Sequence, residues 1–344
     1  MTDERDLGFS ALLTGHPSVG PRRLRELLNE GSAEAGWITM GGDPRVDPLP
    51  IASALHAAGI EMLVEGGPGY PDRLARYPDP PALLFARGDL TALEPLRVAI
   101  VGTRRCTGSG AGFARELGRE LTEAGVAVVS GLALGIDGAS HRGVLDAGGR
   151  PIGVVGSGLD VVYPSRHHDL WQRVGSEGLL LSEAPLGARP AAWRFPARNR
   201  IIAGLAELVV VVESHASGGS MHTVRQAADR DIEVMAVPGS VRCPSAAGTN
   251  QLIAEGCAPV RDVTDVLVAL GLSAASRATV TDTRVSPDPR GKQVLDAFDW
   301  EPATLEHLAV RTGLALPDLA LTVESLLEAG WIEASGGWFE RLST

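Results

Sequence analysis

The sequence contains few residues of the kinds that cross-link a protein or anchor it in a membrane. Its three cysteines, Cys106, Cys243 and Cys257, form no C-x-x-C pair, which argues against a disulfide framework or a structural zinc and favours reduced thiols. No apolar run approaches the roughly 18–20 residues that span a bilayer, and the acidic start MTDERDLGFS lacks the features of a signal peptide. We therefore expect a cytoplasmic protein without a membrane segment, a bound metal or a cofactor.

Lysine is almost absent from the chain. Among 344 residues with a formal net charge of −11 there is one lysine, Lys292. Residues 93–272 carry 17 basic and 18 acidic side chains, so the acidic excess lies in the two flanks. Any anion site in the middle of the chain must therefore use arginine side chains or backbone N–H groups.

The middle of the chain alternates short apolar runs with amphipathic stretches. Runs that are apolar at every position are typical of strands buried between two helix layers. This alternation predicts an α/β fold with an extended Rossmann-like, doubly wound and mostly parallel sheet. We expect strands at 97–101, 126–130, 152–155, 179–181, 208–212 and 234–237, and helices at about 111–124, 138–147, 165–174, 197–206 and 220–230.

The two flanks differ from the middle. Residues 1–80 have a mostly helical pattern, with a tight corner at Gly20, and predict a small helical N-terminal domain of the helix-hairpin-helix or SAM-like kind and a connector to a Rossmann-like domain at 81–272. Residues 273–291 are polar and predict a linker. Three short helical stretches and a two-strand ribbon then predict a winged-helix domain at 292–344.

Glycine- and serine-rich loops follow most of the predicted strands. In open parallel sheets the ligand site lies beyond the carboxyl ends of the strands, where such loops present backbone N–H groups to anions. A βα turn requires glycine in any case, but several such loops on one edge, with Arg104 and the Arg198/Arg200 pair, favour a phosphate-binding pocket. The loops are at 101–112, 130–141, 156–164, 213–226 and 238–250.

The run FPARNRIIAGL (195–205) places two arginines at the start of an otherwise apolar helix. One explanation is that Arg198 and Arg200 form salt bridges to Glu207 or Glu213. Phosphate contact is the favoured alternative, because Asn199 between them adds a donor and an acceptor suited to nucleic acid.

Several other polar residues favour structural roles. Asp137 and His141 lie four apart at a helix start, where Asp137 is expected as an N-cap and His141 as a hydrogen-bonded structural residue. Glu183 and Glu213 end strands and are expected to cap a helix or pair with an arginine. His167 and the following histidine are expected on a solvated helix face.

Common enzyme signatures are missing. The sequence has no G-K-[ST] phosphate loop, no G-x-G-x-x-G and no G-x-S-x-G, and Ser130 stands where a ribose-binding acid would end the second strand. These absences favour a binding protein without catalysis. Two alternatives remain open: a phosphoribohydrolase-type enzyme, although SGGSMHTVRQ ends in Gln226 where that loop requires an acid, and a nucleotide-sensing regulator that binds duplex DNA.

Eight motifs occur in a characteristic order over about residues 60–270: VGTR (101–104), SGLALGID (130–137), VVYP (161–164), SEAPLG (182–187), FPARNRIIAGL, SGGSMHTV (217–224), VPGS (237–240) and GTNQLI (248–253). Together they closely resemble the DprA/Smf family of DNA-processing proteins. This resemblance implies a protein that binds single-stranded DNA and loads RecA recombinase in natural transformation and recombination, usually as a homodimer. It also implies that the family's DNA-binding arginine corresponds to Arg104 and its F-x-x-R-N-R motif to Phe195, Arg198, Asn199 and Arg200.

Backbone contacts are expected to dominate DNA binding, because aromatic residues make up only 4% of the chain and base stacking should be sparse. Helix 317–329 carries three acidic and no basic residues, so the predicted winged helix is expected to contact protein or support assembly. Before the predicted strand at 234–237, Asp231-Ile232 stands where members of the family usually have Gly-Arg, so this region has one positive charge fewer. The predicted DNA-binding residues are Gly102, Thr103, Arg104, Arg105, Ser130, Gly131, Gly135, Arg194, Phe195, Arg198, Asn199, Arg200, Ser217, Gly218, Gly219, Ser220 and Asn250, with Asp137 and His141 as structural residues at the site.

Overall fold

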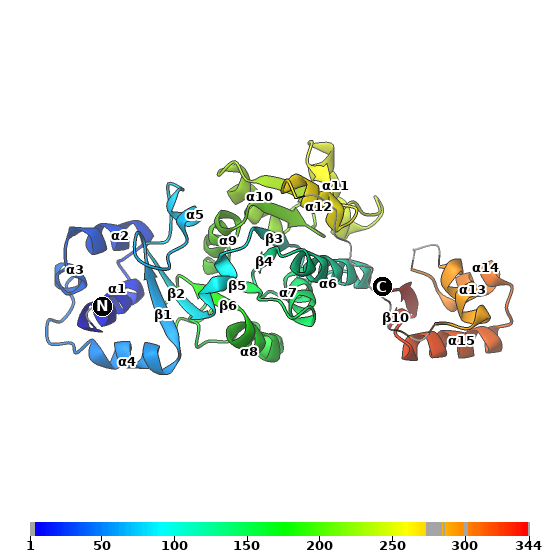
Figure 1. Ribbon diagram of the computed structural model, residues 1–344, viewed down its shortest axis with the longest axis horizontal. Coiled ribbons are helices and arrows are strands. Elements are labelled where there is room, and N and C mark those ends of the chain that lie inside the picture. Colours follow the sequence, from blue (N-terminus) through cyan, green and yellow to red (C-terminus); the bar gives the residue numbers. More distant parts are fainter. Residues whose placement is uncertain (1–3, 273–283, 285, 299–301, 343–344) are drawn as a thin grey trace.

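The computed structural model describes residues 4–272, 284, 286–298 and 302–342. N-terminal helices, a central sheet with helices on both faces, and a C-terminal group of helices follow one another along the long axis (Figure 1). In the described parts of the chain, no helix is long and apolar enough to cross a membrane.

Within the described residues nine strands form one sheet, in the order β1-β2-β6-β5-β4-β3-β7-β8-β9. The strands from β6 to β9 run parallel, whereas β1 and β2 are antiparallel at one edge. The predicted Rossmann-like, mostly parallel sheet is therefore confirmed. The strands are β1 Ile60–Val64, β2 Leu83–Gly88, β3 Arg97–Val101, β4 Ala127–Ser130, β5 Ile152–Val155, β6 Leu179–Ser182, β7 Leu208–Val211, β8 Glu233–Ala236 and β9 Ala258–Pro259.

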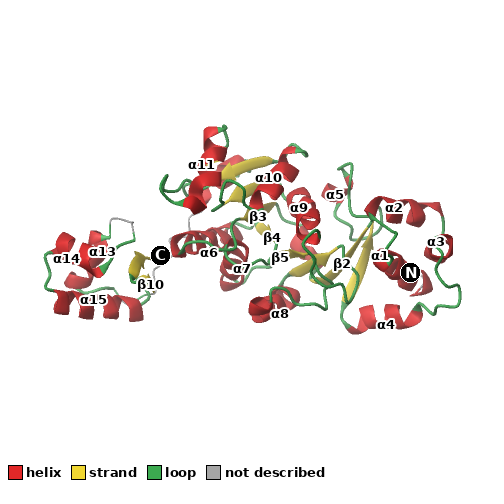
Figure 2. Cartoon of the chain, turned by 180° about the vertical axis from the view of Figure 1, so that it is seen from behind, coloured by secondary structure: helices red, strands yellow, loops and turns green. Residues whose placement is uncertain are grey.

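Helices cover both faces of this sheet (Figure 2). One face packs against α9, α10 and α11, and the other against α6, α7, α8 and α12. Their bounds are α6 Gly108–Glu123, α7 Ile136–Asp146, α8 His168–Glu177, α9 Arg194–Leu205, α10 Ser220–Ala228, α11 Ala247–Ala254 and α12 Val263–Ala269, with 3-10 turns at Leu90–Leu93, Ser165–His167 and Pro244–Ala246.

Strand β3 shows why its sequence is apolar throughout. Val98 and Ile100 pack with α6 and α7, whereas Ala99 and Val101 point to the opposite face and pack with α9. Successive side chains of a strand alternate between the two faces, so a strand covered on both sides buries every residue. Each large side chain buried in this way stabilises the fold by about 1.5–3 kcal/mol.

The N-terminal segment is less helical than its sequence pattern predicts. Helices α1 Glu4–Gly15, α2 Pro21–Glu30, α3 Ala33–Thr39 and α4 Leu49–Ala57 form the helical part, and α5 Asp72–Ala75 lies in the connector. Strands β1 and β2 were not predicted, and they pair with each other and join the main sheet. The expected boundary after residue 80 falls between these paired strands, so we propose a domain boundary near residue 59.

The C-terminal segment contains three helices and a two-stranded antiparallel ribbon around a core of its own. These are α13 Pro289–Ala297, α14 Leu305–Thr312, α15 Leu316–Glu328, β10 Ile332–Ser335 and β11 Trp338–Arg341. The elements match the expected secondary structure, while the assignment as a winged helix stays a prediction. The end of the expected linker forms the first turn of α13, and residues 273–283 and 285 lie outside the described residues.

Candidate functional site

The strand order gathers the predicted loops at one edge of the sheet. From β3 the chain moves outward through β4, β5 and β6 and then returns to β7 on the other side of β3. The crevice at such a change of direction, beyond the carboxyl ends of parallel strands, is where doubly wound sheets bind ligands. We call this edge, with the loops that follow β3 to β8, the strand-end edge.

A pocket opens at the strand-end edge beside β5. Its walls come from the loops after β3, β4 and β5 and from the first turns of α9. Of the predicted site residues, the structure brings four together in it, Arg104, Gly131, Phe195 and Arg198. The other lining residues are Ala133, Leu134, Val155, Gly156, Ser157, Tyr163 and Pro164. Tyr163 and Pro164 belong to the VVYP motif, which the sequence analysis used for recognition without assigning it to the site.

Arg104 is the solvent-exposed arginine of this pocket. Its side chain is exposed, and no carboxylate partner is found for it within the described residues. The guanidinium carbon lies 5.1 Å from the centre of the Phe195 ring, which in turn lies 5.4 Å from the ring of Tyr163. The aromatic pair therefore holds a positive charge at the mouth of the pocket without neutralising it.

Arg198 faces inward. It is 7% exposed, and its Nη1 donates to the carbonyl oxygens of Gly131, at 2.7 Å, and of Val154. Burial lowers the pKa of Arg198 to about 10, and Asp137 acts in the opposite direction, so the side chain stays charged at neutral pH. In this conformation Arg198 does not make the expected phosphate contact, because its guanidinium hydrogen-bonds to the loop after β4 and to β5.

The loop after β4 has glycine where the backbone approaches other groups closely. A Cβ at Gly131 would lie 2.3 Å from Nη1 of Arg198, and one at Gly135, whose φ is +78°, would lie 2.3 Å from the carbonyl oxygen of Thr103. Both glycines therefore permit tight packing between loops. Their predicted contact with DNA stays a prediction, and the N–H of Gly131 already donates to a carboxylate of the protein itself.

Asp137 stabilises the same loop through hydrogen bonds to its backbone. It is buried in the first turn of α7, and its carboxylate accepts hydrogen bonds from the N–H groups of Gly131, at 3.1 Å, and Ala133, at 3.4 Å. The predicted N-cap role is wrong, because Gly135 is the N-cap residue. Burial raises the pKa of Asp137, and the positive charge of Arg198 opposes this rise.

His141 is fully buried on α7. Neither ring nitrogen finds a hydrogen-bond partner among the described residues, so the expected hydrogen bond is not observed. Burial, with a smaller contribution from His167, lowers the pKa of His141 to about 3. His167 was expected on a solvated face but is also buried, with Nδ1 3.1 Å from the carbonyl oxygen of Leu132. Both residues belong to the packing beneath the pocket.

Arg200 is held in an ion pair beside the pocket. Its Nη2 donates to both carboxylate oxygens of Glu183, at 2.7 and 2.8 Å, and its Nε lies 3.7 Å from Asp79. Burial raises the pKa of Glu183, and Arg200 opposes that rise. The alternative partners considered from the sequence are wrong: Glu207 pairs with Arg97, and Glu213 accepts hydrogen bonds from a threonine.

Glu213 organises the loop that carries Arg104. Its carboxylate accepts from the backbone N–H of Thr107, at 3.0 Å, and from the Thr107 hydroxyl, at 2.6 Å. Thr107 is the N-cap of α6 and accepts in turn from the N–H of Gly110 at 2.9 Å. The backbone N–H of Thr103 donates to the Glu213 carbonyl at 2.7 Å. Strand β7 therefore fixes the loop between β3 and α6, with Arg104 and Arg105 left on its outer surface.

Like Arg198, the predicted contact residues Ser130 and Asn199 are buried. Ser130 is 0% exposed and donates its hydroxyl to the carbonyl of Ile100 at 2.6 Å, which corrects the expectation that it faces a ligand. Asn199 is 9% exposed on α9. A buried side chain can shape the loops around it, but DNA cannot reach Ser130 without a rearrangement of β4.

The loops after β7 and β8 lie on the other side of β3 and do not line the pocket. Ser217 and Gly219 are exposed there, Gly218 is half-buried, and Ser220 is buried with its hydroxyl 2.8 Å from that of Ser214. Asn250 holds the loop after β8, accepting from the N–H of Gly239 at 3.2 Å and donating to its carbonyl at 2.9 Å. The predicted site residues therefore fall into two groups along one edge.

The sequence analysis missed three further arginines of the strand-end edge. Arg166, Arg189 and Arg242 are exposed in the loops after β5, β6 and β8, and no ion pair is found for them or for Arg105 within the described ranges. The carboxylates on these loops accept hydrogen bonds from the protein itself: Asp160 from the Gly187 N–H, and Glu183 and Glu213 as described above. The exposed arginines on these loops thus outnumber Asp160 and Glu213, the loop carboxylates for which no ion pair is found in the described part of the chain, so positive charge is in excess at the strand-end edge although the middle segment is nearly neutral.

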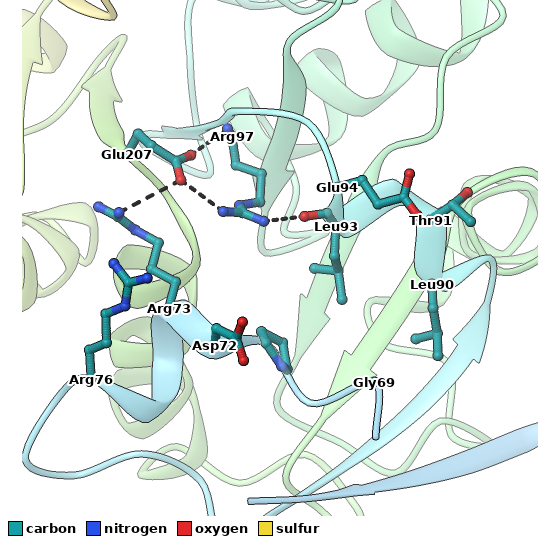
Figure 3. A pocket seen from close by; sticks show the side chains of 11 residues that line it. Gly69, Asp72, Arg73, Arg76, Leu90, Thr91, Leu93, Glu94, Arg97 and Glu207 are labelled. Atoms are coloured by element: carbon teal, nitrogen blue, oxygen red, sulfur yellow. Dashed lines mark hydrogen bonds and ion pairs between the residues drawn. The ribbon is translucent and has the colours of Figure 1, made fainter. Parts of the chain in front are cut away.

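A second pocket lies at the opposite end of β3 and β7 (Figure 3). Arg97 pairs with Glu207 at 2.7 Å and donates to the carbonyl of Leu93, and Arg73 lies 3.7 Å from the same Glu207 carboxylate (Figure 3). These contacts join the connector to the amino ends of two strands. Arg73 and Arg97 thus share the carboxylate of Glu207, whereas the third arginine of this pocket, Arg76, is exposed.

The chemistry available at the strand-end edge is the binding of an extended anion. Open guanidiniums and backbone N–H groups recognise phosphate, and the Phe195 and Tyr163 rings offer apolar surface beside them. Within the residues that the structure describes, no group of three or more His, Cys, Asp or Glu side chains is placed to hold a metal ion.

The chain is similar to proteins of one family. A family model described as DNA recombination-mediator protein A matches residues 61–271. DNA processing protein DprA from Bacillus subtilis is 41% identical over 217 residues, which cover 63% of this chain and 73% of that protein. The X-ray structure of DNA processing protein A from Streptococcus pneumoniae has a TM-score of 0.66 and 33% identity, covering 76% of this chain and 97% of that one.

A further solved structure is that of DNA processing protein A from Helicobacter pylori, which was solved to explain the single-stranded DNA binding mode of that protein. It has a TM-score of 0.56 and 30% identity, covering 61% of this chain and 95% of that one. The segment matched by the family model contains every loop of the strand-end edge.

Proposed function

Because the chain belongs to the DNA recombination-mediator protein A family, that of the DprA and Smf proteins, we propose that it binds single-stranded DNA along the strand-end edge. The observation that carries this proposal is the set of exposed arginines on these loops that have no carboxylate partner in the part of the chain that the structure describes, with Arg104 at the mouth of a pocket. Like charges left uncompensated on one edge destabilise a protein slightly, and a polyanion there removes that repulsion. The H. pylori relative, which binds single-stranded DNA, supports the same assignment.

We propose different roles for the predicted contact residues of the Arg104 loop and of the start of α9. Arg104, Arg105, Arg194 and Phe195 are the groups placed to touch DNA, since each is at least partly exposed. Arg198 instead holds the pocket wall by its bonds to two carbonyl groups. Arg200 can contact a phosphate only if its ion pair with Glu183 breaks. In the DNA-free protein we therefore assign it a structural role beside the pocket.

We also propose that the protein loads RecA recombinase as a homodimer, on the family resemblance alone, and that it does so without catalysing a reaction. The phosphoribohydrolase alternative requires a carboxylate at the end of the 217–226 loop. Gln226 stands there and accepts a hydrogen bond from Arg230 at 2.8 Å, so this position has neither the charge nor the freedom of a catalytic acid.

A titration of labelled oligonucleotides, single-stranded and duplex, at increasing salt tests the proposed function. Arg104→Ala should raise the Kd for single strands about 5- to 10-fold and reduce the log–log salt slope by about 0.7, the value for one phosphate contact. Arg45→Ala removes an exposed arginine of the N-terminal helical part and serves as the control. Equal losses for the two variants, or tighter binding of duplex by the wild type, would contradict the proposal.

A further inference from the structure

Beside the Arg104 pocket lies a groove that, apart from Arg194 and Arg198, is lined by residues outside the predicted contacts. We propose that this groove takes one unpaired nucleobase of the bound strand, stacked on the ring of Trp193. The proposal rests on the proposed function, because it assigns a second subsite to the same DNA.

The groove runs between the N-terminal helices and the strand-end edge. One wall is the corner between α1 and α2, the floor is formed by the ends of β5 and β6, and the other wall is the start of α9. It shares Val155, Gly156 and Arg198 with the Arg104 pocket, so a strand bound at one reaches the other without leaving the surface. The remaining lining residues are Thr14, Pro17, Val19, Gly20, Pro21, Leu24, Glu183, Ala184, Trp193, Arg194, Ala197 and Ile201.

Trp193 is the unusual residue of this groove. It directly precedes α9 and is 66% exposed, the most exposed aromatic side chain found in the described part of the chain. The guanidinium carbon of Arg194 lies 4.7 Å from its ring centre. The arginine thus supports the indole by a cation–π contact, while most of the ring surface remains open to a planar partner.

The lining chemistry suits a base better than a phosphate. Most wall residues are apolar, and Glu183 is already paired with Arg200, so the groove itself offers little to an anion. The cations lie at its rim, Arg194 on one side and Arg104 in the neighbouring pocket. This arrangement places the backbone outside over arginines and a base inside against indole, which is how proteins bind single strands without sequence preference.

Such a subsite also gives a physical reason for a preference for single strands. A base in a duplex is paired and stacked, and it can enter the groove only if that pairing and stacking are broken. The expectation of sparse stacking was based on the overall aromatic content, whereas the structure concentrates Tyr163, Phe195 and Trp193 along one short path.

The test compares an oligothymidylate with an abasic oligonucleotide of the same length and charge. Trp193→Ala should weaken binding of the oligothymidylate about fivefold or more, the lower end of the range for loss of one base–aromatic stack, and leave the abasic oligonucleotide unchanged. Trp193→Phe should restore most of the lost affinity. Trp338→Ala removes an exposed tryptophan of the C-terminal segment and should change neither affinity.

Three results would overturn the base subsite. They are an unchanged oligothymidylate affinity in Trp193→Ala, an equal loss for both oligonucleotides, and a failure of Trp193→Phe to bind better than Trp193→Ala. If Arg104→Ala still weakens both oligonucleotides in these cases, the proposed function stands and the subsite alone is wrong. If the wild-type protein binds neither the oligothymidylate nor the abasic oligonucleotide, the proposed function and the base subsite are both wrong.

Discussion

Arg104 and Arg198 carry the same charge in opposite surroundings. Arg104 is exposed and stacks on Phe195, whereas Arg198 is 7% exposed and bonds to two backbone carbonyl groups. A buried cation requires partners for its N–H groups, because unsatisfied donors in the interior are costly. The two residues should therefore separate DNA binding from stability.

Arg198→Ala should destabilise the protein by about 2–4 kcal/mol. The change removes two hydrogen bonds and leaves Asp137 buried without its nearest cation. Urea unfolding followed by circular dichroism measures this loss. Arg105→Ala, at an exposed position, should change stability by less than about 0.5 kcal/mol, and similar losses for the two variants would contradict the assigned role.

His141 should make the stability of the protein depend on pH. Its pKa is lowered to about 3 in the folded state, from 6.5, so above pH 6.5 the residue is neutral in both states and brings no penalty. As the pH falls from 6.5 toward 3, only the unfolded state takes up the proton, and the free energy of unfolding falls by up to about 1.4 kcal/mol per pH unit.

Replacement of this imidazole should flatten the pH dependence. Between pH 7 and pH 5, His141→Gln should lose about 2 kcal/mol less stability than the wild type, measured by urea unfolding at each pH. His168→Gln, at an exposed position, should keep the wild-type slope. Identical pH slopes for the wild type and His141→Gln would show that the pKa of His141 is the same in the folded and the unfolded protein.

At the scale of single elements, the start of α6 decides how the Arg104 loop is held. Thr107 caps the helix and is itself bound by Glu213 at the end of β7. An N-cap satisfies a backbone N–H that the helix leaves unpaired. Here the cap also connects the first βα loop to a strand that is more than a hundred residues away in the sequence.

Thr107→Ala should therefore cost about 1–2 kcal/mol of stability, since it removes both the cap and the hydroxyl bond to Glu213. Thr107→Ser retains both groups and should stay within about 0.5 kcal/mol of the wild type. Thermal unfolding monitored at several scan rates distinguishes the two. Equal stability of the alanine and serine variants would show that the cap is dispensable.

At the scale of the whole molecule, charge is separated between the sheet and its flanks. Open arginines lie at the strand-end edge, whereas residues 273–344 carry 6 basic and 11 acidic side chains. One of these acids, Glu340 on β11, lies close to the start of α6, since a Cβ at Gly108 would be 2.9 Å from its Oε2. The C-terminal segment also has a core of its own.

Removal of residues 273–344 should accordingly leave most single-strand binding in place, because the deleted segment contributes acidic charge and none of the proposed contacts. Anisotropy titrations of the shortened and full-length chains at equal salt test this expectation. A large loss of affinity would show that the C-terminal segment takes part in DNA binding.

The sequence by itself determined the elements of the sheet. Runs such as RVAIV are typical of strands buried between two helix layers, so strands β3 to β8 and helices α6 to α10 were predictable to within a few residues, whereas β9, α11 and α12 were not predicted. It also placed glycine and arginine on the loops after the strands, which was enough to predict an anion site at this edge of the sheet. Strands β1 and β2 were missed because they lie in a segment whose pattern was interpreted as helical, and periodicity alone does not distinguish a short apolar strand from part of a buried helix.

Only the tertiary structure decided which of these side chains are open. Arg198 meets the carbonyl of Gly131, 67 positions away, and Thr107 meets Glu213, 106 positions away, and no local pattern encodes such pairs. Burial of Arg198 and Ser130 and exposure of Arg104 and Trp193 depend on how distant segments pack, and so does the absence, among the described residues, of ion pairs for Arg166, Arg189 and Arg242. The physical reason is that solvation and hydrogen-bond satisfaction are set by contacts across the sheet, whereas secondary structure is set by neighbours along the chain.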